Sequence, residues 1–370
     1  MIKSPARRAL VVFLSVALAS AASYLPASAQ TRKFLPSVSY SVSDARLYTA
    51  GTRLGALVDT SNGIYAVTYS PKAGAWSRPR ARDVLKPPTD VGSPILGPTL
   101  LRNGSVGLVT PGNVESWTSK TGWVLEDTWS QPDSSSYGSV SADEDVATTD
   151  GGVVAVTSRL LVGCSCSELA ILHKDHGSST WSDLGLPQNF PDTNTSHVGG
   201  YGFLPGHSLM RVVGEDVYFL FAFDFNSGDV VTFAHFNFIN GWTTAQNASV
   251  SHFLLDSVLS GGSLIALTES ASGDHAALED FVPEGVTATA LPDLNASPTA
   301  LVPIGGGRVL VFYSTNTVNG PRYRAVPWSA SAGWGPTIQR GPSRSGWNGI
   351  KVGKLIYAAF PDGTWTRFAI

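Results

Sequence analysis

Seven times along this chain of 370 residues, an apolar run, a glycine-containing turn and a second apolar run follow one another. Thr99–Gly104 followed by Val106–Val109 is a representative instance. The turn glycines are Gly51, Gly104, Gly151, Gly214, Gly262, Gly306 and Gly353, separated by 53, 47, 63, 48, 44 and 47 residues. Tight hairpin turns need positive φ angles, which glycine adopts without a steric penalty. The pattern therefore predicts a repeated antiparallel hairpin.

A tryptophan that follows a second short turn marks most of the repeat units. The instances are Trp76, Trp123, Trp181, Trp242 and Trp334, whereas the fifth unit carries Val286–Ala290 in this place. Each unit is thus predicted to contain four short strands, with the tryptophan at the start of the last one. A large flat ring at an equivalent position in every unit favours packing between neighbouring sheets over stacking on a ligand.

Units of four strands with this period are typical of β-propeller blades, which are roughly 40–50 residues long. The predicted fold is all-β, a single seven-bladed β-propeller over residues 30–370. The last unit ends after three strands, so the alternating segment Val38–Val42 is expected to supply its missing strand and close the ring. Closure would remove open sheet edges, which invite aggregation. Six blades with loose ends are the alternative.

The first 29 residues have the features of an export signal. Lys3, Arg7 and Arg8 precede the apolar run Ala9–Ala22, and Ala27–Ala29 offers a small-residue cleavage site. The apolar run is shorter than the ~20 residues that a membrane-spanning helix needs, which disfavours the alternative of an uncleaved anchor. We expect no membrane span in the rest of the chain and a secreted, periplasmic or cell-surface protein that begins at Gln30.

Composition excludes several function classes. Charged residues make up 14% and the formal net charge is −3, so no clustered basic face indicates nucleic-acid binding. The sequence contains no H-E-x-x-H motif, no G-x-S-x-G motif and no phosphate-binding glycine loop, and it points to no cofactor and no metal. Cys164 and Cys166 are interpreted as a local disulfide or free thiols, which we prefer to a metal site completed by His173 and His176.

Lys174–Trp181 resembles the Asp-box hairpin of sialidase-like propellers, whose pattern is roughly Ser/Thr-x-Asp-x-Gly-x-Thr-Trp, with one extra residue. Asp362–Trp365 is a shortened form of the same motif. Sialidase membership would imply an arginine triad, a tyrosine nucleophile paired with a glutamate, and an aspartate acid/base. These have no identifiable counterpart here, and the Arg-Ile-Pro element is absent, since Thr52–Gly55 does not match it. The repeated Gly-Trp turns are also similar to those of propeller lectins.

The polar loops that join successive units, together with those between the second and third strands, are predicted to meet at one mouth of the ring. Aromatic rings, amides and a few charges there would suit sugar recognition. The candidate ligand-binding residues are Asp90, Tyr137, His197, Tyr201, His252, Arg344 and Trp347. Asp143–Asp145 is an acidic cluster that could bind Ca²⁺, supply a carboxylate pair for glycoside hydrolysis, or form a solvated loop.

Three functions fit these features, and the fold alone does not choose among them. The favoured hypothesis is an exported, non-catalytic, lectin-like protein that binds a glycan or polysaccharide. A glycoside hydrolase of sialidase-like type or a polysaccharide lyase would need converging carboxylates, or a His/Tyr/Arg group, at the axis. A protein-interaction scaffold would need a large apolar patch on one face. The sequence does not set the oligomeric state.

Overall fold

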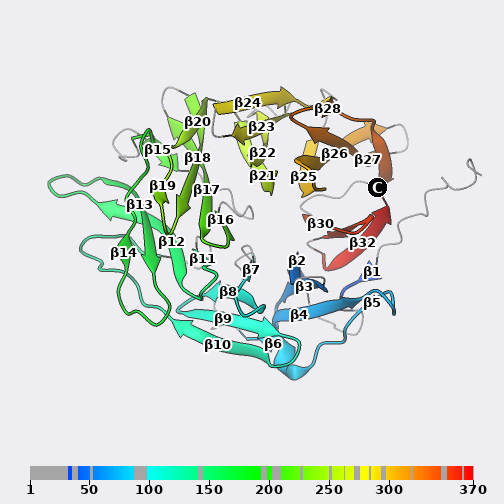
Figure 1. Ribbon diagram of the computed structural model, residues 1–370, viewed down its shortest axis with the longest axis horizontal. Helices are drawn as coiled ribbons and strands as arrows, with labels where there is room; N and C mark the ends of the chain where they lie inside the picture. The colour runs from blue at the N-terminus through cyan, green and yellow to red at the C-terminus, as the bar shows by residue number, and fades with distance from the viewer. Residues whose placement is uncertain are drawn as a thin grey trace, which may run out of the picture.

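The computed structural model confirms an all-β, seven-bladed β-propeller (Figure 1). It describes residues 32–35, 41–50, 53–86, 98–140, 145–192, 198–201, 210–225, 228–249, 252–261, 263–270, 276–282, 285–292, 297–317, 320–342, 348–360 and 362–369. Within these ranges the only helical element is a single 3₁₀ turn at Ala81–Asp83. No helix in the described part of the chain is long and apolar enough to cross a bilayer.

Each blade is an antiparallel sheet, and in most blades the strands follow one another outward from the axis in chain order. Blade 1 contains β2 (Val42–Ala50), β3 (Arg53–Thr60), β4 (Gly63–Ser70), β5 (Ala75–Trp76) and β6 (Val84–Leu85). Blade 2 contains β7 (Thr99–Leu100), β8 (Val106–Thr110), β9 (Asn113–Thr118) and β10 (Gly122–Thr128). Blade 3 contains β11 (Asp145–Ala147), β12 (Val153–Leu160), β13 (Ser167–Lys174) and β14 (Ser182–Asp183). Blade 4 contains β15 (Val198–Tyr201), β16 (Met210–Val213), β17 (Asp216–Phe225), β18 (Gly228–Asn237), β19 (Gly241–Trp242) and β20 (Gln246–Ser249).

The remaining three blades follow the same plan. Blade 5 contains β21 (His252–Ser260), β22 (Ser263–Ser270), β23 (Ala276–Val282) and β24 (Gly285–Ala290). Blade 6 contains β25 (Ser297–Pro303), β26 (Arg308–Thr317), β27 (Gly320–Ser329), β28 (Gly333–Trp334) and β29 (Ile338–Pro342). Blade 7 contains β30 (Asn348–Val352), β31 (Leu355–Ala359), β32 (Thr364–Ala369) and β1 (Arg32–Lys33). The seven predicted hairpins correspond to the two inner strands of the seven blades.

The ring is closed by an N-terminal strand, as expected, but the predicted segment was wrong. Arg32 and Lys33 pair with Trp365 and Thr364 in the outermost position of blade 7. Of the predicted segment Val38–Val42, residues 36–40 lie outside the described ranges and Val42 begins β2. Phe34, only 1% exposed, explains the position of the closing strand. Its ring packs against Trp76 and Trp365, with centroid distances of 4.8 and 6.4 Å.

The hydrophobic core consists of layers between neighbouring blades. Blade 3, for example, packs Val154, Val156, Leu169 and Ile171 against Met210, Val217 and Phe219 of blade 4. Because both faces of each sheet are covered in this way, residues 153–156 are all buried even though successive side chains point to opposite faces. Apolar burial between blades is therefore the main contribution to stability.

The repeated tryptophans join neighbouring blades, which confirms the packing interpretation for four of them among the described residues. Each indole Nε1 donates to a backbone carbonyl at the outer edge of the preceding blade. The pairs are Trp123 with Asp83 (3.2 Å), Trp181 with Ser130 (2.8 Å), Trp242 with Leu184 (2.7 Å) and Trp334 with Ala290 (3.1 Å). These bonds fix the angle between adjacent sheets, because a buried indole N–H needs a partner.

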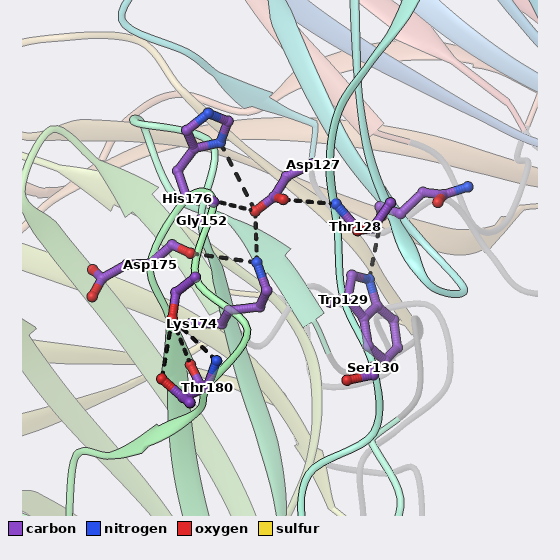
Figure 2. A network of polar contacts seen from close by, with 12 residues as sticks. Asp127, Thr128, Trp129, Ser130, Gly152, Lys174, Asp175, His176 and Thr180 are labelled. Atoms are coloured by element: carbon purple, nitrogen blue, oxygen red, sulfur yellow. Dashed lines mark hydrogen bonds and ion pairs between the residues drawn. The ribbon is translucent and has the colours of Figure 1, made fainter.

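The turn that resembles an Asp box forms a polar clamp between blades 2 and 3 (Figure 2). Lys174, only 2% exposed, donates from Nζ to Oδ2 of Asp127 over 2.6 Å. The backbone amide of Gly177 donates to the same oxygen over 2.9 Å. Burial alone would raise the pKa of Asp127, but the bonds from Lys174, Gly177 and Thr128 bring it below its ordinary value. The motif thus has a structural role in this chain.

We predict that Asp127→Asn destabilises the protein by about 3 kcal/mol, because it leaves the Lys174 ammonium buried without a counter-charge. The measurement is the free energy of unfolding from urea denaturation at pH 7. Asp133→Asn is the matched control, since the Asp133 carboxylate accepts bonds only from Ser135 and Ser136 on an exposed loop. Asp133→Asn should lower the free energy of unfolding by less than half as much as Asp127→Asn.

The pH dependence of this difference follows from the depressed pKa of Asp127. A carboxyl with a lowered pKa in the folded state stabilises the fold above its ordinary pKa, and the contribution is lost as the pH falls through the folded-state value. The gap between the wild type and Asp127→Asn should therefore narrow below about pH 4. A gap that is constant from neutral to acid pH would show that the ion pair does not stabilise the fold.

Candidate functional site

Most of the sequence-predicted ligand residues stay predictions. Asp90, His197, Arg344 and Trp347 lie outside the described residues, as does the cluster Asp143–Asp145 apart from the backbone of Asp145. Tyr201 belongs to β15 and His252 to β21, but their side chains are not described. Only the side chain of Tyr137 is placed.

Tyr137 belongs to a polar cluster on blade 3. Its hydroxyl donates to Oδ2 of Asp183 over 3.0 Å. Arg159 forms an ion pair with the same carboxylate and a second one with Glu168 at 2.9 Å. Partial burial and the bond to Asp183 raise the pKa of Tyr137, so its hydroxyl stays protonated. Because the polar groups of the cluster pair with one another, Tyr137 offers an aromatic surface and does not act as a general base.

Beside this cluster, the turn between β12 and β13 carries a disulfide between Cys164 and Cys166, whose Cα atoms are 5.2 Å apart. His173, considered above as a metal ligand, is buried and its ring packs on Phe238 with a centroid distance of 4.6 Å. Among the described residues, no group of three or more histidine, cysteine, aspartate or glutamate side chains could hold a metal ion.

Charged side chains on the innermost strands form a more promising site. The strands β2, β16 and β21 face the axis of the ring (Figure 1). They carry Asp44 and Arg46 in blade 1, Arg211 in blade 4 and Asp256 in blade 5. We call these four residues the axial cluster. Charged side chains on these strands lie beside the central channel or against the inner edge of the next blade, as the bonds between Arg211 and Ser257 and between Asp256 and Leu301 show.

The charges of the two arginines in the axial cluster influence one another. Burial lowers the pKa of Arg211, Asp256 opposes this effect, and the positive charge of Arg46 adds to it. Blades 1 and 4 are not neighbours in the ring, so their guanidinium groups can influence one another only across the axis. Arg211 donates from Nη2 to the carbonyl of Ser257 over 2.6 Å. Its buried Nε has no hydrogen-bond partner within the described structure.

On the blade 1 side, the axial cluster continues into a pair of carboxyl groups. Asp44 accepts a bond from Nε of Arg46 at 2.9 Å. Asp59 on β3 is directly opposite Asp44 in the strand register, so the two side chains share a face of the sheet. Asp59 is 3% exposed, and burial followed by the charge of Asp44 raises its pKa despite a bond from Ser43. The pair therefore places a carboxyl group that holds its proton more tightly than usual next to one that is bonded to Arg46.

The local backbone explains why Asp44 and Asp256 face alike. The register of the two inner strands shifts between Val42 and Asp44 in blade 1, and between Leu254 and Asp256 in blade 5. A bulge of this kind redirects the side chain that follows it. Asp256 accepts backbone amide bonds from Ser257 and from Leu301 of blade 6, each 2.8 Å long. It thereby satisfies an N–H on the open edge of the next blade.

Sequence reasoning missed the axial cluster, although the chain contains a signal for it. Asp44, Arg46 and Arg211 stand within or beside the runs that precede the turn glycines Gly51 and Gly214. A charged residue inside a strand that is expected to be innermost is a candidate for a site beside the channel. Chemically, the described part of the site offers an arginine whose Nε has no hydrogen-bond partner, a second arginine paired with Asp44, and the neighbouring carboxyl groups of Asp44 and Asp59.

Comparison with known proteins supports the fold without giving a family. No protein-family model matches the chain, and no curated protein matches it in sequence. A solved structure of similar fold is an ulvan lyase, a polysaccharide lyase, bound to -[GlcA(1-4)Rha3S]-. It is 10% identical, with a TM-score of 0.51, and the match covers 92% of this chain and 96% of the lyase. This likeness shows a shared propeller fold.

Two further structures have lower scores. BamB from Moraxella catarrhalis is 11% identical with a TM-score of 0.42, and the match covers 94% of this chain and 100% of BamB. A prolyl endopeptidase is 11% identical with a TM-score of 0.49, and the match covers 87% of this chain. The chain spans 47% of that enzyme, about half its length.

We predict that Asp44→Asn lowers the pKa of Asp59, because the substitution removes a neighbouring negative charge and releases Arg46 from its ion pair. Carboxyl ¹³C chemical shifts of labelled aspartates, followed as a function of pH, give the measurement. Asp362→Asn in a turn of blade 7 is the control and should leave the titration of Asp59 unchanged. If the pKa of Asp59 is the same in the wild type and in Asp44→Asn, the two carboxyl groups are not coupled.

Proposed function

We propose that this chain is an exported, lectin-like propeller that binds an acidic polysaccharide at the axial channel. The observation that carries the proposal is Arg211, on the innermost strand of blade 4, whose buried Nε has no hydrogen-bond partner among the described residues. An unpaired buried donor is costly unless a ligand satisfies it. Guanidinium groups match the geometry of carboxylate and sulfate groups.

The ion pairs already present within the axial cluster favour a ligand whose single negative charges are separated along its length. Asp44 already pairs with Arg46, and Asp256 is satisfied by two backbone amides. The donor capacity of Arg211 is therefore the part of the cluster left for an anionic group. A propeller of similar fold was solved with -[GlcA(1-4)Rha3S]-, a saccharide with a carboxylate on one unit and a sulfate on the other, which supports this ligand class.

Export fits a ligand of this kind, because acidic polysaccharides are found outside the cell membrane. We propose that residues 1–29 are removed as a signal peptide, on the strength of the basic residues and the apolar run described above. N-terminal sequencing of the protein recovered from the medium or the periplasm tests this step. Recovery of the intact N-terminus in the membrane fraction would contradict it.

We expect the mature protein to bind polygalacturonate, and Arg211→Met to weaken this binding at least tenfold, since a hydrogen bond to a charged group contributes about 1.5–3 kcal/mol. Isothermal titration calorimetry at low and moderate salt gives the measurement. Arg102→Met is the matched control. It removes the same charge from a guanidinium that is ion-paired with Glu215 at the blade surface.

Dextran, which carries no charge, should not bind with comparable affinity. Equal affinity for dextran and polygalacturonate, or equal losses in Arg211→Met and Arg102→Met, would overturn the role of the axial cluster. Near-ultraviolet circular dichroism of each variant ensures that a loss of binding does not reflect a disturbed fold.

A second candidate function is cleavage of the same polysaccharide, favoured by the coupled pair Asp44 and Asp59. A carboxyl group with a raised pKa beside a second carboxyl group is an arrangement used for acid/base catalysis of glycoside hydrolysis. If the pair is catalytic, Asp59→Asn should abolish the release of reducing ends while polygalacturonate still binds. An unsaturated uronate end, detected by its ultraviolet absorbance, would instead indicate a lyase. Absence of both products in the wild type would favour the non-catalytic function.

A further inference from the structure

A cavity lies between blades 1 and 2, on the face of the ring formed by the turns between the first and second strands. Its volume is about 220 Å³, the space of roughly seven water molecules at ~30 Å³ each. Tyr48, Leu54 and Gly55 of blade 1 and Val106 and Trp117 of blade 2 contribute to its wall. This volume suits a ligand with a single ring.

A phenol without a partner lies in the wall of this cavity. Tyr48 is 7% exposed, and its hydroxyl has no hydrogen-bond partner in the described structure. The ring lies directly over Gly55, where a Cβ atom would come within 2.1 Å of Tyr48 Cζ, so glycine is required for this placement. Burial, and then the charge of Asp83, raise the pKa of Tyr48. The hydroxyl is therefore protonated at neutral pH and can donate to an acceptor on a ligand.

The rim of the cavity is positively charged. Arg53 contributes to the wall, is exposed, and has no ion-pair partner among the described residues. Ser119, also part of the wall, accepts bonds at its carbonyl from Arg80, whose charge is paired with Asp83, and from Arg82. No carboxylate belongs to the described lining. The cavity thus favours an anionic group at its opening.

Between the phenol and the rim the wall is apolar. Ala50 and Val106 contribute aliphatic carbon, and Trp117 contributes an indole whose Nε1 is already bonded to Asp83 at 3.3 Å. Apolar surface of this kind accepts a flat ring, and the aromatic contact with Trp117 adds to the burial term. The phenol hydroxyl, the apolar wall and the arginine at the rim each match one part of a ligand: a hydrogen-bond acceptor, a flat ring and an anionic group.

We propose that this cavity binds a hydroxyl-substituted aromatic monocarboxylate, with its carboxylate at Arg53 and its hydroxyl oxygen accepting from Tyr48. The site is separate from the axial cluster and does not depend on it. Its ligand differs from the proposed polysaccharide in size and in the apolar character of its ring. It would give the propeller a second, small-molecule ligand.

The test uses para-hydroxybenzoate and benzoate as probes in isothermal titration calorimetry with the full mature chain. We expect the wild type to prefer para-hydroxybenzoate about tenfold, the contribution of one hydrogen bond. Tyr48→Phe should abolish this preference and leave the affinity for benzoate unchanged. Tyr65→Phe is the matched control, since Tyr65 is equally buried on the opposite face of blade 1 and should change neither affinity.

Arg53→Gln should weaken both carboxylates about tenfold and leave para-hydroxybenzamide unaffected, because only the charged probes use the guanidinium. Arg211→Met should have no effect on any probe, which separates this site from the polysaccharide site. Failure of both carboxylates to bind the wild type would overturn the proposal. So would a preference for para-hydroxybenzoate that persists in Tyr48→Phe, or glucuronate binding as tightly as either aromatic probe.

Discussion

Packing of each blade against its two neighbours is the interaction on which this structure depends. A sheet of four short strands with apolar residues on both faces is not stable alone, because only adjacent blades remove those faces from water. The apolar layers supply most of the burial, and directional bonds then fix the relative orientation of the sheets. Such bonds are made by the indole N–H groups, by Lys174 with Asp127, and by Asp256 with Leu301. The shape of the channel follows from this angular arrangement.

The axial cluster takes its properties from the ring and not from any one blade. Arg46 and Arg211 are 165 positions apart in the sequence, and nothing in either strand alone would bring them together. Their mutual repulsion is offset locally, since Asp44 pairs with Arg46 and Asp256 lies near Arg211. The ring therefore brings two like charges under one another's influence, and Nε of Arg211 has no hydrogen-bond partner among the described residues. This arrangement is the basis of the proposal that the axis binds an anion.

The sequence predicts the repeating architecture well because the period is encoded locally. Gly104 and Gly151 adopt φ angles of 79° and 92°, and a turn with this requirement is visible in the residue pairs Asn103-Gly104 and Asp150-Gly151. The closing strand was predicted less well, because alternation in Val38–Val42 shows that a segment is extended but not which sheet edge it joins. The deciding residue was Phe34, whose partners Trp76 and Trp365 come from two different blades. Tyr137 and Asp183 illustrate the same limit, since their bond joins residues 46 positions apart.

The pairing of Arg32–Lys33 with Thr364–Trp365 has a consequence for the order of assembly. Blades 1 to 6 each arise from one continuous stretch of chain, so the pairing of their strands needs no segment from elsewhere in the sequence. Blade 7 forms only when residues from opposite ends of the described chain come together. A few contacts around Phe34 must offset the entropic cost of closing so long a loop. Until that moment the propeller is an open arc with two unprotected edges. Arg46 and Arg211 reach their final positions only when the arc becomes a circle, so the geometry of the axial cluster is the last feature of the molecule to form.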